Sequence, residues 1–269
     1  MIKRMRDWKI PVVQTMVLCV VTIVLCTMDV NAIVMGILQF ASIEINELPV
    51  ECRLAISFGP RVLSGIIWLA FLWVIRRFNV NGILNKGSEY HDHYYVSYCF
   101  CRYVLGYKKC CLTRVPIYMQ FKLVLADLFP EYLYTDGIHE LKSDMISVVR
   151  SGECNDTVNL IISDTYRLDR GQLPGSVQGF ASIYVERQTI DKVRYHNEDL
   201  VKKVVETVRS LPPSVVNVNV FATTNPWNTY DIAKEAFATG SRDAIERVYV
   251  FQQSSTSERL FSAKGKRVL

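Results

Sequence analysis

Two long apolar runs near the start of the chain limit most strongly what it can fold into. The first run extends from Ile10 to Met28, and the second extends from Leu54 to Ile75. A helix needs about 20 mainly apolar residues to cross ~30 Å of hydrocarbon, and both runs are close to that length. The sequence therefore predicts an N-terminal transmembrane helical hairpin.

Charged residues around the two runs predict how the hairpin is oriented. Basic residues precede the first run and follow the second one: Lys3, Arg4, Arg6, Lys9, Arg76 and Arg77. The segment between the runs is acidic, with Arg53 as its only base: Asp29, Glu44, Glu47 and Glu51. Because Lys and Arg remain on the cytoplasmic side, we expect a multi-pass protein with both termini in the cytoplasm.

A cleaved signal peptide is an alternative for the first run. A basic start, an apolar core and the residues "VNA" before Ile33 fit the pattern of such a peptide and its cleavage site. Even in that case, Arg76 and Arg77 would keep the larger C-terminal part in the cytoplasm.

The second run contains a charge, Arg61, close to its outer end. A charge in the middle of a membrane helix costs ~2.5–3.5 kcal/mol on insertion scales, and snorkelling lowers that cost. A helix that begins at Pro60 would leave only about fifteen apolar residues, which is short for a bilayer. Ala55 and Gly59 form a small-xxx-small step that lets helices approach closely. Gly59 and Arg61 are therefore the residues for which we expect a membrane function beyond anchoring.

The composition fits a small membrane portion attached to a soluble one. Half of the 269 residues are hydrophobic (50%), the net charge is +5, and the mean hydropathy is +0.14. These values are high for a soluble domain and low for a transporter with many spans. We divide the chain into a transmembrane region, a basic aromatic juxtamembrane segment, an α/β sensing domain and a flexible basic tail, at residues 1–77, 78–145, 146–253 and 254–269.

From Thr157 onward, strand patterns alternate with helix patterns. The β-branched runs "TVNLIIS", "FASIYVE", "VVNVNVFA" and "IERVYVFQQ" predict strands. Helices are predicted for "NEDLVKKVVETVRSL", with Asn197 as N-cap, and for "TYDIAKEAFATG". This order predicts a cytoplasmic α/β domain with a small, partly parallel sheet.

Two loops of this domain are candidates for a ligand site, because ligands of open α/β sheets bind beyond the carboxyl ends of the strands. They are residues 164–176 and residues 223–231. A nucleotide would suit their side chains: an indole for the base, hydroxyls and an amide for polar edges, and a guanidinium for phosphate, supplied by Trp227, Thr223, Thr224, Asn228 and Arg167. The alternative is a plain turn with Asn228 as a cap and a half-buried Trp227. The sequence has no glycine-rich phosphate loop, which argues against an ATPase or a dehydrogenase.

The segment between the spans and the α/β domain mixes basic with aromatic residues. Its stretch "RYVLGYKKCCLTRVPIYMQFK" has no acidic residue and five basic ones: Arg102, Lys108, Lys109, Arg114 and Lys122. Such a mixture binds anionic lipid surfaces or single-stranded nucleic acid, or it is an ordinary domain with aromatic core residues. We favour membrane contact because the segment directly follows a span.

The same segment contains histidines and cysteines, at His91, His93, Cys99, Cys101, Cys110 and Cys111. Imidazoles and thiolates are ligands of zinc, but the spacings here include no C-x-x-C pair. We therefore predict no metal and no cofactor, and we expect reduced thiols in a reducing cytoplasm.

The arrangement resembles the two-transmembrane effectors of bacterial anti-phage systems, which join a helical hairpin to a cytoplasmic sensing domain. Some of those effectors respond to cyclic nucleotides, and others accompany retron reverse transcriptases. The resemblance implies a protein of the bacterial inner membrane that assembles into homo-oligomers and breaches the lipid bilayer in abortive infection. Its partner would be a nucleotide ligand or a nucleic-acid/reverse-transcriptase complex. No catalytic residue and no cofactor follow from it.

Two other classes of function remain open from the sequence. One is a membrane-tethered enzyme that uses the residues from His91 to Cys111 or the loop after Asp164. The other is a passive membrane receptor or adaptor.

Overall fold

The computed structural model describes residues 8–27, 36–37, 39–40, 50–87, 89–134, 145–188, 195–238, 245–254 and 259–269, without the side chains of 51–57 and 60. The chain forms two compact units. The first, here called the membrane unit, comprises Met1–Leu84 and Val96–Lys108, and the second, the α/β unit, comprises Asn85–Tyr95 and Lys109–Leu269. The expected juxtamembrane segment of residues 78–145 thus contributes to both units.

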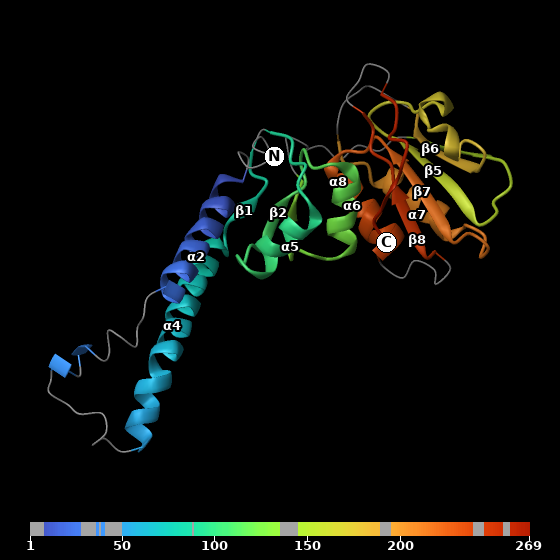
Figure 1. Ribbon diagram of the computed structural model, residues 1–269. Helices are drawn as coiled ribbons and strands as arrows, with labels where there is room; N and C mark the ends of the chain where they lie inside the picture. The colour runs from blue at the N-terminus through green and yellow to red at the C-terminus, as the bar shows by residue number, and fades with distance from the viewer. Residues whose placement is uncertain are drawn as a thin grey trace. The chain divides into compact units, whose positions relative to one another are not determined.

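The membrane unit is built on two antiparallel helices, α2 (Lys9–Thr27) and α4 (Val50–Asn79) (Figure 1). Near one end Gln14 and Asn79 exchange two side-chain hydrogen bonds of 2.8 and 2.9 Å. Further along, the indole of Trp68 donates to Thr22 over 3.1 Å.

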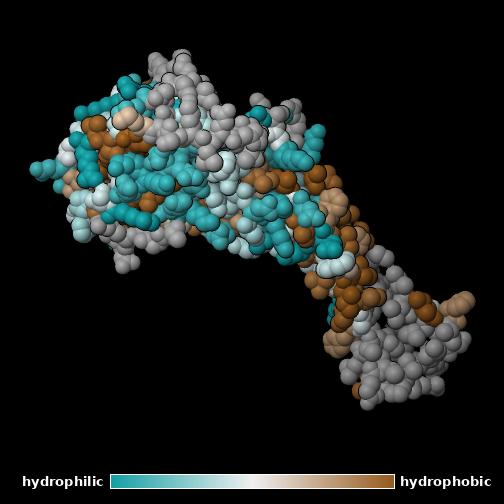
Figure 2. Space-filling model, turned by 180° about the vertical axis from the view of Figure 1, so that it is seen from behind, coloured by the Kyte–Doolittle hydropathy of each residue, from teal (hydrophilic) through white to brown (hydrophobic). Residues whose placement is uncertain are grey.

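Both helices have segments that are long and apolar enough to cross a membrane, at Lys9–Thr27 and Arg61–Asn79. Their side chains give this part of the molecule the apolar surface seen in Figure 2. Of the acidic residues expected outside the membrane, Asp29, Glu44 and Glu47 lie outside the described residues, and Glu51 belongs to α4.

Arg61 is exposed on α4, at the first residue of the segment that could span. The helix begins at Val50 and continues through Pro60, so it does not start at Pro60 as the alternative for a short span required. At Gly59 no other atom lies within 4 Å of the place that a Cβ would take. The side chain of Ala55 lies outside the described residues.

One end of this helical pair contacts α5 (Tyr95–Tyr103), a short helix whose residues from Val96 onward belong to the membrane unit. The ring of Tyr98 meets the ring of Trp8 edge-on at 5.0 Å. After α5, Gly106 has φ +80, and a Cβ there would lie 2.9 Å from Cγ of Arg76. A glycine is therefore needed for this close approach.

The α/β unit contains a six-stranded sheet in the order β4-β6-β5-β7-β8-β9 (Figure 1). Its strands are β4 (Ile146–Ser151), β5 (Thr157–Ser163), β6 (Ala181–Arg187), β7 (Asn217–Ala222), β8 (Arg247–Val250) and β9 (Lys266–Arg267). The four inner strands are parallel, and the two edge strands pair antiparallel. The predicted α/β class is confirmed, although the sequence did not predict β4.

Helices cover one face of the sheet: α6 (Ile117–Leu125), α7 (Glu198–Arg209), and α8 (Pro226–Ile232) with its π-helical continuation Ala233–Ala238. The helix α7 packs on β6, α6 packs on β8, and α8 contacts both of these helices. Asn197 caps α7 as predicted, since its side chain accepts a hydrogen bond of 2.9 Å from the amide of Leu200.

The start of α8 differs from the sequence-based expectation. Asn225, and not Asn228, is the N-cap, and its side chain accepts from the amide of Asn228 over 3.0 Å. The helix therefore begins at Pro226, before the expected Thr229. Proline is common at this first helical position, because the amide hydrogen that it lacks would make no hydrogen bond within the helix.

The opposite face of the sheet is covered by the segment after β5 and by the end of the chain. A buried apolar cluster joins Ile161 and Phe221 of the sheet to Leu168, Leu173, Val177, Phe251 and Phe261. The segment after β5 also carries two short 3-10 helices, Arg170–Gln172 and Gly175–Val177. Leu168 and Leu173, from one of the two loops predicted to bind a ligand, thus pack against the sheet.

The end of the chain departs from the expected flexible tail. β9 pairs with β8, and Phe261 is only 6% exposed within the cluster just described. A single buried phenylalanine and a short edge pairing therefore fix a segment whose composition is otherwise polar and basic. Residues 255–258 lie outside the described part.

Two further short strands of the α/β unit lie before the large sheet in sequence. β2 (Lys109–Cys111) pairs in parallel with β3 (Glu131–Leu133), and α6 connects them. The membrane unit ends its first segment with β1 (Ile83–Leu84). The β2–α6–β3 piece supplies one wall of the site described next.

Candidate functional site

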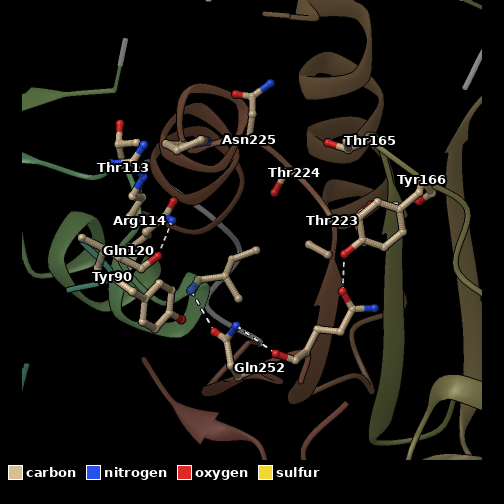
Figure 3. A pocket seen from close by; sticks show the side chains of 15 residues that line it. Tyr90, Thr113, Arg114, Gln120, Thr165, Tyr166, Thr223, Thr224, Asn225 and Gln252 are labelled. Carbon is tan, nitrogen blue, oxygen red and sulfur yellow. Dashed lines mark hydrogen bonds between the residues drawn. The ribbon is translucent and has the colours of Figure 1, made fainter. Parts of the chain in front are cut away.

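A pocket of about 370 Å³ opens beyond the carboxyl ends of β5, β7 and β8 (Figure 3). The strand order reverses at β5 and β7, because the chain passes from β5 to β6 on one side and then to β7 on the other. Ligands of open α/β sheets bind at such a switch point. The residues after these strands line the pocket: Thr165, Tyr166, Thr223, Thr224, Asn225, Gln252 and Gln253.

The other wall of the pocket comes from the segment around α6. Its lining residues are Tyr90, Thr113, Arg114, Val115, Ile117 and Gln120. In Figure 3, Tyr90, Arg114 and Gln120 lie across the pocket from Thr223 and Tyr166. Gln252 joins the two walls, because its side-chain oxygen accepts a hydrogen bond of 3.0 Å from the amide of Ile117.

Arg114 holds an uncommon backbone conformation in this wall, with φ 59. A residue other than glycine in the left-handed region costs of order 1–3 kcal/mol, and such residues cluster at ligand sites. Its carbonyl oxygen accepts from the amide of His91 over 2.9 Å, and its guanidinium donates to the carbonyl oxygen of Gly87 over 3.2 Å. These bonds hold the backbone and the guanidinium of Arg114 in place.

Two buried polar atoms of the same wall have no hydrogen-bond partner among the described residues. They are Oγ1 of Thr113 and Oε1 of Gln120, whose residues are 9% and 6% exposed. The amide nitrogen of Gln120 is held, since it donates to the carbonyl oxygen of Val115 over 2.7 Å. A buried polar group without a partner costs about 1–3 kcal/mol, and both residues line the pocket.

The remaining polar atoms of the pocket are uncharged at neutral pH. Loss of solvent around the hydroxyl is the main cause that raises the pKa of Tyr90 to about 12, and the charges of Asp92 and Tyr118 act in the same direction. The hydroxyl of Thr224 shares a hydrogen bond of 2.8 Å with that of Thr229. Among the described residues that line the pocket, Arg114 is the single cation and none is acidic.

Next to the pocket, a second polar cluster at the same strand ends is fully buried. Asp164 accepts a hydrogen bond of 2.9 Å from the side chain of Asn228, and its carbonyl oxygen accepts one of 3.1 Å from Nε of Arg187. The guanidinium of Arg187 lies 4.4 Å from the ring centre of Tyr195. Arg187 and Asp164 are 0% and 1% exposed. We call these residues, Asp164, Arg187, Tyr195 and Asn228, the closed network.

The five residues predicted to bind a ligand do not all meet in the pocket. Thr223 and Thr224 line it, but the hydroxyl of Thr223 donates to the carbonyl oxygen of Tyr166 over 3.0 Å and so closes the strand ends. Asn228 belongs to the closed network. Arg167 lies away from the pocket lining, 63% exposed and 3.7 Å from Glu186.

Trp227 also lies outside the pocket lining and is packed against other rings. It stacks on His196 at 4.2 Å and lies 5.1 Å from the ring of Tyr134. Nε2 of His196 in turn lies 2.8 Å from Oδ2 of Asp231. Burial raises the pKa of Asp231, and the hydrogen bond with His196 acts in the opposite direction. The histidine–carboxylate pair thus positions the indole.

The histidines and cysteines of the segment from His91 to Cys111 are divided between the two units. His91 and His93 lie in the α/β unit with their rings 6.2 Å apart, and burial is the main cause that lowers the pKa of His91. Cys99 and Cys101 belong to the membrane unit. Within the described residues, no group of three or more His, Cys, Asp or Glu is arranged to hold a metal ion.

Sequence reasoning missed the wall formed by Tyr90, Thr113, Arg114 and Gln120 as part of the ligand site. Arg114 was noted only as one of several bases in a juxtamembrane segment. A signal was present, because "TR" before "VPIYMQFK" puts a cation directly ahead of a helix start. Nothing in the linear sequence indicates that this helix packs beside β8.

A family comparison decides the class of the protein. The model of the SMODS- and Ubiquitin system-associated 2TM effector domain (SUa-2TM) matches residues 8–269. The chain belongs to the SUa-2TM family. The expected resemblance to two-transmembrane effectors of bacterial defence systems is thereby confirmed. No curated protein matches the SUa-2TM chain.

Solved structures similar to this SUa-2TM protein include the Cap4 SAVED/CARF-domain containing receptor of Acinetobacter baumannii. Its structure with 3'3'3'-cAAA shares 10% identity at a TM-score of 0.40, over 64% of this chain and 40% of that one. The structure with 2'3'3'-cAAA shares 8% sequence identity at a TM-score of 0.43, and the match covers 64% of this chain and 42% of the receptor chain. The structure of the receptor without a named ligand shares 8% sequence identity at a TM-score of 0.35, and the match covers 63% of this chain and 39% of the receptor chain. The matches thus span well under half of each receptor chain, and these low scores assign neither a ligand nor a function to this protein.

Proposed function

We propose that this SUa-2TM protein is a nucleotide-gated membrane effector of anti-phage defence. In this proposal the α/β unit binds a nucleotide in the pocket beyond β5 and β7, and the spans then breach the bacterial inner membrane and arrest the cell. The observation that carries the sensing part is the combination of Arg114 with the unpartnered atoms of Thr113 and Gln120 in one pocket. The effector part rests on the family match.

The chemistry of the pocket suits a nucleotide better than a highly charged ligand. Hydroxyl and amide groups can bond the polar edges of a base, and one guanidinium can hold one phosphate through two parallel hydrogen bonds. The volume of about 370 Å³ lies at the lower end of the usual range for small-molecule sites, roughly 300–1,000 Å³. A cyclic oligonucleotide would place one nucleotide here and extend outward past Thr224.

The membrane part of the proposal concerns Arg61 and Gly59. Several copies that pack along α4 could direct their Arg61 side chains toward a shared hydrated interior, which lowers the cost that one arginine bears in lipid. The open space around Gly59 means that a larger side chain there would meet a neighbouring copy before it met its own chain. Both termini would be cytoplasmic, because the bases that flank the spans remain inside.

The sensing and effector parts can be tested separately. Cells that express the full chain together with a cyclic-oligonucleotide synthetase are followed with a membrane-potential dye. We expect depolarisation in the wild type, and none in Arg114→Ala or in Arg61→Leu. The purified Arg61→Leu protein should still bind the nucleotide, whereas Arg114→Ala should not. If potential is kept while wild-type cells die, the membrane breach is wrong, and nucleotide sensing can still hold.

A further inference from the structure

The helix α5 presents an apolar face that nothing in the described chain covers. Val96, Phe100 and Tyr103 follow one another at helical spacing and are 75%, 36% and 64% exposed. The other face of the helix is buried, with Tyr98 at 0% and Cys101 at 2%. A helix with large apolar side chains directed outward is typical of a segment that lies in a membrane interface.

Contacts inside the membrane unit fix α5 beside one end of the two spans. Tyr98 meets Trp8 at the start of α2, as described above. Arg76 near the end of α4 donates from Nη1 to the carbonyl oxygen of Tyr103 over 2.9 Å. The side chain of Asn79 donates to the carbonyl oxygen of Leu105, also over 2.9 Å. The exposed face of α5 is therefore held at the end of the apolar helices and cannot swing away from it freely.

Between α2 and α5 lies a groove of about 530 Å³. The residues that line it come from both helices: Trp8, Pro11, Val12, Thr15 and Met16, then Val96, Ser97, Phe100 and Cys101. Most of the α2 lining belongs to the segment Lys9–Thr27, which is apolar enough to span. The groove therefore lies against the start of a helix segment that is apolar enough to cross a membrane.

Charge around the groove favours a phospholipid over another apolar occupant. The residues from Val96 to Lys108 include Arg102 and Lys108 and no acidic side chain. Arg77 is exposed at the end of α4, and Lys9 is exposed at the start of α2. An apolar groove beside a candidate span, with cations close by in the chain, matches a lipid with a phosphate headgroup and an acyl chain.

We propose that α5 lies in the cytoplasmic leaflet with Val96, Phe100 and Tyr103 immersed in it, and that the groove between α2 and α5 holds an acyl chain of a phospholipid. This inference stands on the membrane unit alone and does not depend on nucleotide binding. It makes α5 a lipid-contacting element that connects the spans to the chain that follows.

Site-specific photo-cross-linking in native membranes tests the immersed face. The photoreactive amino acid p-benzoylphenylalanine replaces Val96 or Tyr103 in the full chain, and lipid adducts are measured by mass spectrometry. Val17, on the exposed side of α2, is the positive control, and Lys202, on the exposed side of α7, is the negative control. We expect adducts at 96 and 103 to exceed those at 202 at least ~10-fold and to approach those at 17. Adducts at the level of Lys202, or cross-links to protein in their place, would overturn the proposal.

A second measurement tests the groove itself. Ser97→Trp fills the groove, so the purified protein should carry at least one phospholipid fewer than the wild type in native mass spectrometry. The matched control Lys202→Trp should keep the wild-type lipid. An unchanged lipid count in a folded Ser97→Trp protein would show that no acyl chain occupies the groove, and the cross-links at 96 and 103 decide the immersed face independently.

Discussion

Two polar clusters lie at the same strand ends of the α/β unit, and they differ in whether their polar side chains bond one another. In the closed network, Asp164 bonds Asn228 and Arg187, and the whole set is buried. In the pocket, Thr113 and Gln120 each keep a buried oxygen without a partner in the described chain. Polar residues beyond a strand therefore do not by themselves indicate a ligand site. We assign a structural role to the cluster around Asp164, because its carboxylate already bonds the side chain of Asn228, and a binding role to the pocket.

The largest expected effect comes from opening the closed network. Asp164→Ala removes a carboxylate whose Oδ1 lies 3.7 Å from Nε of buried Arg187. A buried charge that loses its partner costs about 3–5 kcal/mol of unfolding free energy. Urea-dependent pulse proteolysis of the full chain in nanodiscs measures this loss. The matched control Asp156→Ala, at an exposed site, should change the unfolding free energy by less than about 0.5 kcal/mol. A small effect of Asp164→Ala would mean that the network is not a structural one.

Replacing two buried threonines by valine compares a hydroxyl that makes a hydrogen bond with one that makes none. Thr207 donates to the carbonyl oxygen of Lys203 over 2.7 Å, so Thr207→Val should lower the unfolding free energy by about 1 kcal/mol. The hydroxyl of Thr113 has no such bond, so Thr113→Val should raise the unfolding free energy by up to about 1 kcal/mol and weaken nucleotide binding. Pulse proteolysis gives both values. Equal losses in both variants would show that Thr113 has a structural role after all.

The smallest effect is expected at Arg167, which the sequence predicts as a phosphate ligand. Its guanidinium is exposed and pairs loosely with Glu186, and exposed ion pairs contribute about 0–1 kcal/mol. Arg167→Ala should leave both the unfolding free energy and nucleotide affinity within error of the wild type. A clear loss of affinity would place the ligand nearer to the segment after β5 than the pocket does.

Local patterns in the sequence account for much of the α/β fold. The run Thr157–Ser163 is apolar or β-branched except at Asn159 and Ser163, as is typical of strands buried on both faces, and Asn217–Ala222 contains the apolar residues Val218, Val220, Phe221 and Ala222. The helix after Asn197 combined a capping side chain with a regular apolar face. The edge strand β4 was missed because its three outer residues, from Val149 to Ser151, are exposed, and an edge strand needs no apolar run.

The candidate site could be predicted only in part. The rule for strand ends selected Thr223 and Thr224, which line the pocket. It could not identify Arg114 or Gln120, because they reach the pocket through packing of α6 on β8 and α8, which leaves no periodic signal in sequence. It also could not distinguish Asn228 from a ligand-binding amide, since only the partner Asp164 shows that its hydrogen bonds are already used.

Equilibrium binding of cyclic di- and trinucleotides to the full chain in nanodiscs tests the central claim most directly. The wild type should bind at least one of these probes, and Arg114→Ala should weaken that binding about 10- to 100-fold, because hydrogen bonds to a charged group contribute about 1.5–3 kcal/mol. Arg167→Ala serves as the control with unchanged affinity. If no probe binds, or if Arg114→Ala binds as tightly as the wild type, the pocket beyond β5 and β7 is not the sensor.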